Sequence, residues 1–228
     1  MTKPPKLTET VAVDDGTLHR ISDLPDSLLV RILSLLPTTK DAFRSCLVSK
    51  RWQYLWTSID NLTLVCSSTG SEKFLSFVDY ALAQRTCSNI RKFHLEIWDM
   101  PSYSLHIEQW LSYVIENKVE HVVLRSIFYK LVYTLPQFFY TCSSLITLEL
   151  MSCVFDKGAV ISWKSLKTLL SGCLALETME LEFFHGFHHL EINNSNLKTL
   201  KLDMAWPLYE DADHSLEIVV PYLQHLKI

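Results

Sequence analysis

Apolar residues recur along this chain with two different periods, and the change of period divides the sequence. In SDLPDSLLVRILSLLP, at residues 22–37, the apolar positions have a helical spacing. They cover an arc of about 160°, wider than the usual core-facing stripe of about 100°. These positions are Leu28, Leu29, Ile32, Leu33, Leu35 and Leu36. Pro25 and Asp26 favour a helix start, and Pro37 favours a stop.

Two further helical segments follow closely. Thr38 or Thr39 suits the cap of a short helix that carries Ala42, Phe43 and Cys46. A third helix is predicted by the spacing i, i+3, i+4 and i+7 of Trp52, Leu55, Trp56 and Ile59. A segment of fewer than about fifty residues cannot bury all of this apolar surface within itself. The surplus either packs on the rest of the chain or stays open for a partner.

The remaining sequence alternates helical patterns with a short repeated one. Helical spacing groups Phe74, Phe77, Val78, Ala81 and Leu82, and later Ile107, Trp110, Leu111, Val114 and Ile115. From Ile90 onward the repeated pattern is apolar-x-x-apolar-x-apolar, whose last steps alternate as a strand does. Its copies are IRKFHL, VEHVVL, LITLEL, LETMEL, FHHLEI, LKTLKL and LQHLKI. A strand with an irregular or helical return every 20 to 30 residues is typical of leucine-rich repeats.

The spacing of these copies is irregular. FHHLEI begins at Phe187, only a short step from both LETMEL and LKTLKL, so one of these copies is expected to be an extra strand or turn within a single coil. Leu166 opens like another strand, but the pattern breaks at Leu170 and Ser171. Residues Leu166 to Cys173 are therefore predicted to fold mainly as a helix or turn. Stacked coils favour a curved array with a parallel sheet on the concave side.

Composition narrows the class of protein. The 228 residues, 48% hydrophobic and 20% charged, allow one or two globular domains. A formal net charge of -4 gives no electrostatic footprint for nucleic acid or an anionic membrane. The first residues read as a solvated tail without the apolar core of a signal peptide, and no apolar run approaches the ~18 residues that would span a bilayer. Six dispersed cysteines are interpreted as reduced core thiols, which predicts a cytoplasmic or nuclear protein.

Signals for catalysis are weak. EFFHGFHH brings His185, His188 and His189 close to Glu182 in sequence, but His188 and His189 would point to opposite faces of a strand. A zinc site needs about four converging ligands, so a surface turn leading into a repeat strand is the favoured interpretation. No cysteine lies in a nucleophile motif, and five scattered glycines supply no phosphate loop. We assign no catalytic, cofactor-binding or metal-binding residue.

Two blocks of sequence resemble a known family. LPDSLLVRILSLLP followed by VSKRWQYLW resembles, without a gap from His19 to Leu64, the F-box of plant F-box/leucine-rich-repeat proteins. LPQFFYTCSSLITLEL, LLSGCLALETMEL and NLKTLKL are similar to the repeats of that family. The resemblance implies a mixed α/β fold: a three-helix F-box, then an irregular, shortened leucine-rich-repeat solenoid with a parallel sheet on its concave side. The expected divisions are a disordered tail (1–18), the F-box (19–64), a helical spacer (65–89) and the repeat region (90–228).

The resemblance also implies a function. Proteins of this family are non-catalytic substrate receptors of SCF-type ubiquitin ligases: the F-box docks on the Skp adaptor, attached to a cullin that carries the RING subunit. The family's adaptor-contacting positions fall here on Leu24, Pro25, Leu28, Leu29, Ile32, Leu33, Val48, Trp52 and Trp56. Some of these also form the core of the F-box, and the sequence does not divide the two roles.

The target protein, whose identity the sequence does not give, is expected on the outward positions of the repeat strands. These are His94, Glu96, His121, Val123, Thr147, Glu149, Thr178, Glu180, Thr199 and Lys201. The alternative is a non-ligase protein whose truncated array binds the adaptor, holds no substrate and acts as a competitor. An independent enzyme is disfavoured because no polar side chains converge. Since the sequence ends at Ile228 within a strand pattern, the repeat region is expected to be less stable than the adaptor-bound F-box.

Overall fold

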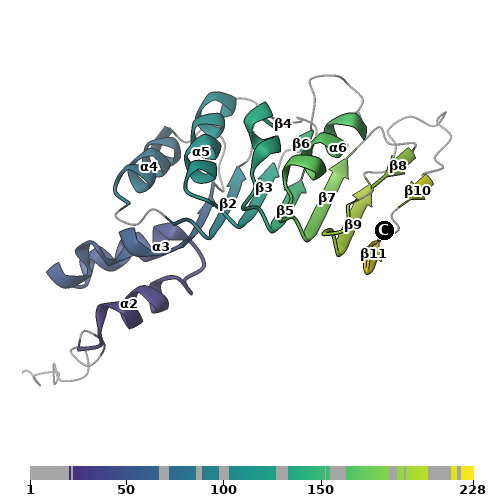
Figure 1. Ribbon diagram of the computed structural model, residues 1–228. Coiled ribbons are helices and arrows are strands. Elements are labelled where there is room, and N and C mark those ends of the chain that lie inside the picture. Colours follow the sequence, from purple (N-terminus) through teal and green to yellow (C-terminus); the bar gives the residue numbers. More distant parts are fainter. Residues whose placement is uncertain are drawn as a thin grey trace, which may run out of the picture.

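A computed structural model of the protein describes most of the chain (Figure 1). A group of short helices at the N-terminus leads into a stack of strands with helices along one side. None of the helices described has both the length and the apolar character needed to cross a membrane. The tail predicted at residues 1–18 lies outside the described residues, which are 21, 23–66, 72–85, 89–97, 103–126, 133–151, 153–154, 163–184, 189–192, 194–204, 217–219 and 222–228.

The first leucine-rich segment forms helix α2 (Asp26–Leu33), which follows Pro25 as predicted. It ends earlier than Pro37 would require. Leu35 and Leu36 donate their backbone N–H groups to carbonyls only three residues back, at 3.1 and 3.2 Å, so the last turn tightens before the proline. Ser34 also donates its hydroxyl to the carbonyl of Val30 at 2.9 Å.

The predicted third helix is wrong in type. After α3 (Thr39–Arg44), the chain forms three 3₁₀ turns: η1 (Ser45–Leu47), η2 (Lys50–Gln53) and η3 (Leu55–Ser58). Tyr54, with φ -118° and ψ -5°, separates the last two. Thr57 donates its hydroxyl to the Tyr54 carbonyl at 2.7 Å, and this local bond offers the backbone an alternative to a continuous helix. Trp52 and Leu55 are both buried as the spacing predicted, although they lie in separate 3₁₀ turns.

Two adjacent threonines fix the junction between these helices and the sheet. Thr38 caps α3, as predicted, by accepting a hydrogen bond from the backbone N–H of Asp41 at 3.2 Å. Thr39 is almost fully buried, and its hydroxyl accepts the backbone N–H of Thr63 at 2.8 Å. Thr63 lies on the first strand of the sheet, so a side chain of α3 satisfies one donor on an edge that would otherwise be open.

Seven parallel strands form the main sheet, which confirms the predicted parallel arrangement. In spatial order they are β1 (Asn61–Val65), β2 (Lys92–Ile97), β3 (His121–Ser126), β5 (Thr147–Met151), β7 (Thr178–Phe184), β9 (Thr199–Met204) and β11 (His225–Lys227). The helices lie along one face of this sheet (Figure 1). They are α4 (Glu72–Ala83), α5 (Ser104–Glu116) and α6 (Trp163–Gly172), together with the 3₁₀ turn η5 (Gln137–Thr141).

The irregular copies resolve as expected. The copy at Phe187 gives β8 (His189–Glu191), which lies outside the main sheet and pairs with β10 (Glu217–Val219). A second small pair joins β4 (Tyr133–Thr134) to β6 (Cys153–Val154). The two short steps of the sequence pattern therefore belong to one coil. Helix α6 contains Leu166 to Gly172, which confirms that this segment is not a repeat strand.

The strand register stacks the inward side chains into continuous rows. One row, buried throughout, consists of Leu62, Phe93, Val122, Leu148, Met179 and Leu200. The buried residues form a single cluster from Leu29 in α2 to Leu202 in β9. At the start of the strands, one backbone carbonyl of each coil accepts two N–H groups from the next coil. These carbonyls belong to Asp60, Arg91, Glu120, Ile146, Glu177 and Lys198.

Close contact between neighbouring coils explains the glycine in LLSGC. Gly172 is the last residue of α6, which packs against η5 of the preceding coil. A Cβ atom at Gly172 would lie 1.8 Å from the carbonyl oxygen of Tyr140, closer than any real contact. The obstacle is backbone and cannot rotate away. Only glycine therefore permits this approach.

We predict that Gly172→Ala lowers the free energy of unfolding by about 2 kcal/mol, because α6 or η5 must shift to admit the methyl group. Thermal unfolding followed by circular dichroism measures the effect. Ser171→Ala is the matched control, since Ser171 is exposed and donates only to the Lys167 carbonyl one turn earlier. Equal melting temperatures for the two variants would contradict the prediction.

Candidate interaction surfaces

The apolar residues of the N-terminal helices fall into two groups that the sequence could not separate. Leu29, Leu33, Trp52 and Trp56 are buried in the protein's own core. Leu28 and Ile32, one turn apart on α2, are 45% and 41% exposed. We call the exposed group the outer apolar surface; it consists of Leu28, Ile32, Leu35, Leu36, Leu47 and Val48. Among the remaining predicted positions, Pro25 is exposed and Leu24 is partly buried against the core.

Aromatic rings connect the N-terminal helices to one another and to α4. The ring of Trp56 meets Phe43 edge-on with centroids 5.2 Å apart, and stacks on Tyr80 of α4 at 5.9 Å. Arg51 ties the segment after Val48 to the start of α2, because its guanidinium pairs with the carboxylate of Asp26 at 2.6 Å. The outer apolar surface is therefore held on a rigid base. In this arrangement Trp52 and Trp56 support the surface and do not form it.

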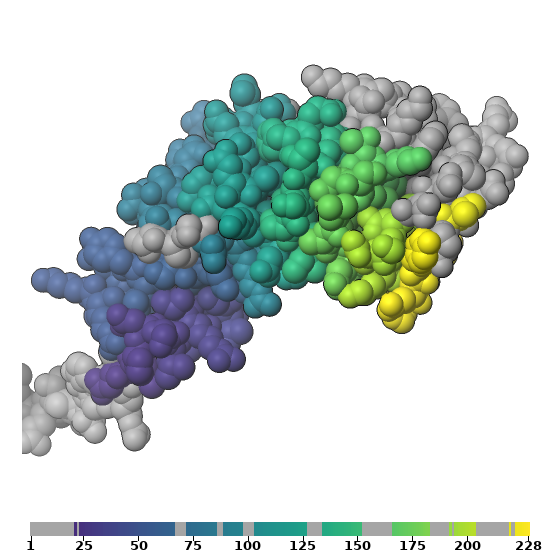
Figure 2. Space-filling model, in the orientation of Figure 1, coloured from purple at the N-terminus to yellow at the C-terminus, as the bar shows by residue number. Residues whose placement is uncertain are grey.

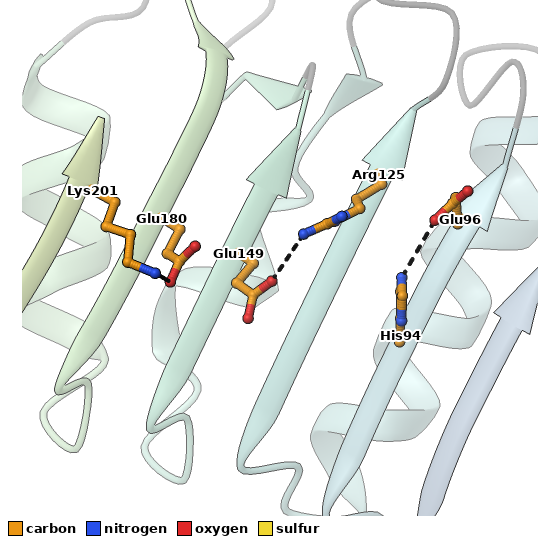
Figure 3. Close-up of polar contacts among 6 residues, drawn as sticks. All are labelled: His94, Glu96, Arg125, Glu149, Glu180 and Lys201. Atoms are coloured by element: carbon orange, nitrogen blue, oxygen red, sulfur yellow. Dashed lines mark hydrogen bonds and ion pairs between the residues drawn. The ribbon is translucent and has the colours of Figure 1, made fainter. Parts of the chain in front are cut away.

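The second candidate surface is the face of the sheet opposite the helices, which we call the concave face. Figure 3 shows six of its polar side chains pointing away from the helices behind the strands. The register places its side chains in three rows, each running from strand to strand. The first row holds Lys92, His121, Thr147, Thr178 and Thr199, the second His94, Val123, Glu149, Glu180 and Lys201, and the third Glu96, Arg125, Met151, Glu182 and Asp203.

All the positions predicted for substrate lie on this face, but Val123, which was expected to face solvent, is buried with 2% of its surface exposed. The copies IRKFHL and VEHVVL align Lys92 with His121, whereas the predicted set included Glu96 and not Lys92 from the first of these strands. The structure pairs His94 with Val123 and Glu96 with Arg125. Five residues of these rows were missed: Lys92, Arg125, Met151, Glu182 and Asp203. The same alternation of side chains would have found them, because Lys92 lies within its copy and each of the other four directly follows the end of its copy.

Several charged side chains of the second and third rows form ion pairs with each other. Arg125 lies 3.4 Å from the carboxylate of Glu149, and Lys201 forms a hydrogen-bonded ion pair with Glu180 (Figure 3). The hydrogen bond to Glu180 raises the pKa of Lys201. Burial, followed by the nearby charges of Lys92 and Arg125, lowers the pKa of His94 to about 4. Burial also lowers the pKa of His121.

His94 is therefore neutral at pH 7, and its Nε2 is buried without a hydrogen bond. The carboxylate of Glu96 lies 3.7 Å from this Nε2. In the strand register Glu96 itself is opposite Arg125 of β3.

Neither surface carries a reactive constellation among the described residues. No group of three or more potential metal ligands converges in that part of the chain; His185 and His188 of the weighed zinc cluster lie outside it. Cys46, Cys66, Cys142 and Cys173 are free thiols. Burial raises the pKa of Cys173 to about 12, so its thiol stays protonated and acts as a small apolar side chain.

A shallow groove beside α6 is lined by Leu170, Ile192, Asn194 and neighbouring residues. Its asparagine side chains form hydrogen bonds to the protein backbone. Asn194 donates its amide to the carbonyl of Leu170 at 2.9 Å, and Asn196 donates to that of Leu174 at 2.7 Å. Both amides thus join the coil to its neighbour and are not free to bind a ligand through those donors.

Comparisons with known proteins find a matching family and relatives that cover most of the chain. A profile of the F-box-like family matches residues 21–62. F-box/LRR-repeat protein 25 of Arabidopsis thaliana is 29% identical over 227 residues, which covers 91% of this chain and 84% of the relative. The FBD-associated F-box protein At1g66310 of the same plant is 31% identical over 246 residues, covering 94% of this chain.

Coverage of the relatives' own length differs. The chain spans 53% of At1g66310 and 50% of the putative F-box/LRR-repeat protein At5g02930, which is 29% identical over 240 residues. The matches therefore include both the helical N-terminus and the repeated strands, and for these two relatives they cover about half of the relative.

We predict that the protein loses stability as the pH falls from about 6.5 to about 4. In this range the unfolded chain protonates His94, whereas the folded protein keeps it neutral, so the unfolded state binds more protons. At pH 4.5 this group alone lowers the free energy of unfolding by about 2 kcal/mol. Urea unfolding at pH 7 and pH 4.5 measures the change.

The control compares His94→Gln with His225→Gln, which replaces an exposed histidine near the C-terminus. The His94 variant should lose part of the pH dependence, and the His225 variant should keep it. If wild type and His94→Gln lose the same free energy on acidification, the desolvated imidazole is not the cause.

Proposed function

With an F-box-like domain at residues 21–62 and F-box/LRR-repeat relatives along most of the chain, we propose that this protein is a substrate-recognition subunit of an SCF-type ubiquitin ligase. In this role the F-box binds the Skp adaptor, and through it the cullin and the RING subunit. The concave face of the repeats binds the target protein. The chain itself is a non-catalytic receptor.

The observation that carries this proposal is the outer apolar surface. Leu28 and Ile32 remain exposed, whereas Leu29 and Leu33 of the same helix are buried in the core. Leu35 and Leu47 are still more exposed, at 79% and 85%. Clustered exposed leucines on a short helical segment are typical of interface anchors. The F-box segment projects from one end of the repeat stack, which leaves room for a partner (Figure 2).

Within this proposal the predicted adaptor positions take different roles. Pro25, Leu28, Ile32 and Val48 are exposed and supply contacts. Leu24 lies at the margin of the core, and the buried residues Leu29, Leu33, Trp52 and Trp56 hold the helices in place. Transfer of ubiquitin then depends on proximity, because the receptor raises the effective concentration of a target lysine near the conjugating enzyme.

We expect the double variant Leu28→Asp/Ile32→Asp to bind the Skp adaptor at least thirtyfold more weakly than the wild type. Truncating a buried anchor costs about 2 kcal/mol, which is roughly this factor, and a carboxylate adds a desolvation penalty. Titration of the purified adaptor by calorimetry measures the affinity.

The matched control is Leu105→Asp/Leu174→Asp, which replaces two exposed leucines, at 65% and 62%, outside the F-box. Circular dichroism verifies that both variants are folded. Adaptor binding at wild-type strength by folded Leu28→Asp/Ile32→Asp protein would refute the interface.

If the protein is a substrate receptor, we also expect a specific set of proteins to co-purify with it from cells. An affinity-tagged chain should co-purify with cullin and with a ubiquitylated client, and the client's ubiquitin should disappear in the Leu28→Asp/Ile32→Asp variant. Mass spectrometry with a ubiquitin-remnant antibody measures this. Recovery of the adaptor without cullin or a modified client would instead favour a competitor that binds the adaptor and holds no substrate.

A further inference from the structure

The passage from the F-box into the sheet contains no free linker. Only two residues, Ile59 and Asp60, separate the 3₁₀ turn η3 from strand β1. Ile59 is 2% exposed and belongs to the buried core. The carbonyl of Asp60 accepts the backbone N–H groups of Arg91 at 2.9 Å and Lys92 at 3.2 Å, at the start of the next coil. The repeat stack itself therefore holds both connecting residues.

Thr39 makes the first of two side-chain contacts across this junction. Its hydroxyl accepts the backbone N–H of Thr63 at 2.8 Å, and the residue is 1% exposed. Thr63 lies on β1, the edge strand of the described sheet, so the bond is made on the side that has no neighbouring strand. A hydrogen bond depends on direction as well as distance, and this one therefore fixes where α3 lies along β1.

Tyr80 of α4 makes the second contact. Its ring stacks on Trp56 with centroids 5.9 Å apart and meets Phe43 edge-on at 6.2 Å. Trp56 and Phe43 belong to the F-box, whereas α4 connects β1 to β2 in the first coil. Phe77, one turn earlier on α4, also meets Phe43 edge-on, at 5.7 Å. Aromatic pairs prefer particular orientations, so these contacts restrict rotation between α3 and α4.

The two contacts hold the same helix at two points. Thr39 and Phe43 lie one turn apart on α3, the first bonded to the strand of the first coil and the second packed on its helix. A helix held at two points by two different elements cannot pivot about either contact alone. The F-box therefore has one orientation relative to the sheet.

Neither Thr39 nor Tyr80 belongs to the outer apolar surface. Thr39 is buried at the junction, and Tyr80 lies outside the segment 21–62 that matches the F-box-like family. The F-box lies at one end of the repeat stack (Figure 1), and the two candidate surfaces are connected through this junction. Its geometry therefore sets the angle between the outer apolar surface and the concave face.

We propose that Thr39 and Tyr80 are positioning residues, which hold the outer apolar surface and the concave face in one fixed relative orientation. A substrate protein on the concave face is then presented at a constant distance and direction from the adaptor. Such constant geometry favours transfer of ubiquitin to a lysine of the bound substrate. This inference rests on the proposed function, because it assigns how the receptor orients its two partners.

The test measures the distance between a spin label in the F-box and one on α5, in the full chain both free and bound to the purified Skp adaptor. Gln53 and Glu108 are exposed, and each is replaced by p-acetylphenylalanine, which takes a label without using the native cysteines. Double electron–electron resonance gives the distribution of distances. The junction variant is Thr39→Val/Tyr80→Ala. The conservative variant Thr39→Ser/Tyr80→Phe keeps the hydroxyl and the ring.

We expect one narrow distribution for the wild type and for the conservative variant, and a distribution roughly twice as wide for the junction variant. Adaptor affinity should stay within about twofold of the wild type in all three. The matched control is Ser144→Ala/Tyr222→Ala. It removes the hydrogen bond from Ser144 to the Val119 carbonyl and an exposed ring, both beyond the labelled positions, and should leave the width unchanged.

The junction variant should also separate binding from transfer in cells. It should co-purify the same client proteins as the wild type, with roughly threefold less ubiquitin on them, because the client's lysine is no longer held near the conjugating enzyme. A variant that only lowered stability would lose client and ubiquitin in the same proportion.

Four results would overturn the proposal: a junction variant as narrow as the wild type, equal broadening by the control, a conservative variant as broad as the junction variant, or unchanged ubiquitin on the clients. Loss of adaptor affinity by the junction variant would assign Thr39 and Tyr80 to the folding of the F-box instead. Failure of the wild type to bind the adaptor would contradict the proposed function alone. Both labels are on the chain, so the free protein still reports whether the junction is fixed.

Discussion

Each coil of the sheet buries its inward side chains only against the coils on either side, and the rest of the structure depends on this requirement. Phe93 is fully buried because Leu62 precedes it and Val122 follows it in the same row. At the N-terminal end the covering unit is the F-box. Thr39 accepts the backbone N–H of Thr63, and the buried cluster runs without a break from α2 into the sheet. The F-box therefore acts as the terminal cap of the repeats and shares their core.

The same requirement leaves one face of the sheet bare. Parallel sheets are usually covered by helices on both faces, but the helices in the described part of this chain lie on one face only. The uncovered face carries threonines and charged residues. Their positions follow from the register that the apolar rows impose, so the sheet presents a fixed pattern of charges.

Much of this architecture could be predicted from periodicity. The strands β2, β3, β5, β7, β8, β9 and β11 and the helices α4 and α5 followed from spacing, and the break in the pattern indicated that Leu166 to Gly172 is not a strand. The strands β1, β4, β6 and β10 lie outside the repeated copies and were not predicted. The third F-box helix could not be predicted correctly, because Trp52 and Leu55 have a spacing that suits both an α-helix and a 3₁₀ turn. The sequence also did not predict which leucines of the F-box are buried and which are exposed. Leu28 and Leu29 are the same residue type one position apart, and only packing decides which is buried.

The strand register also determines how the chain can fold. Paired strand residues are between 20 and 31 residues apart in sequence, from Tyr133 and Cys153 at one extreme to Asn61 and Lys92 at the other. Thr39 and Thr63, which join the F-box to the sheet, fall within the same interval. Every major contact thus closes a loop of similar, modest length, so none carries an exceptional entropic cost. During synthesis each coil can dock on the one before it as it leaves the ribosome, and the F-box provides the first template.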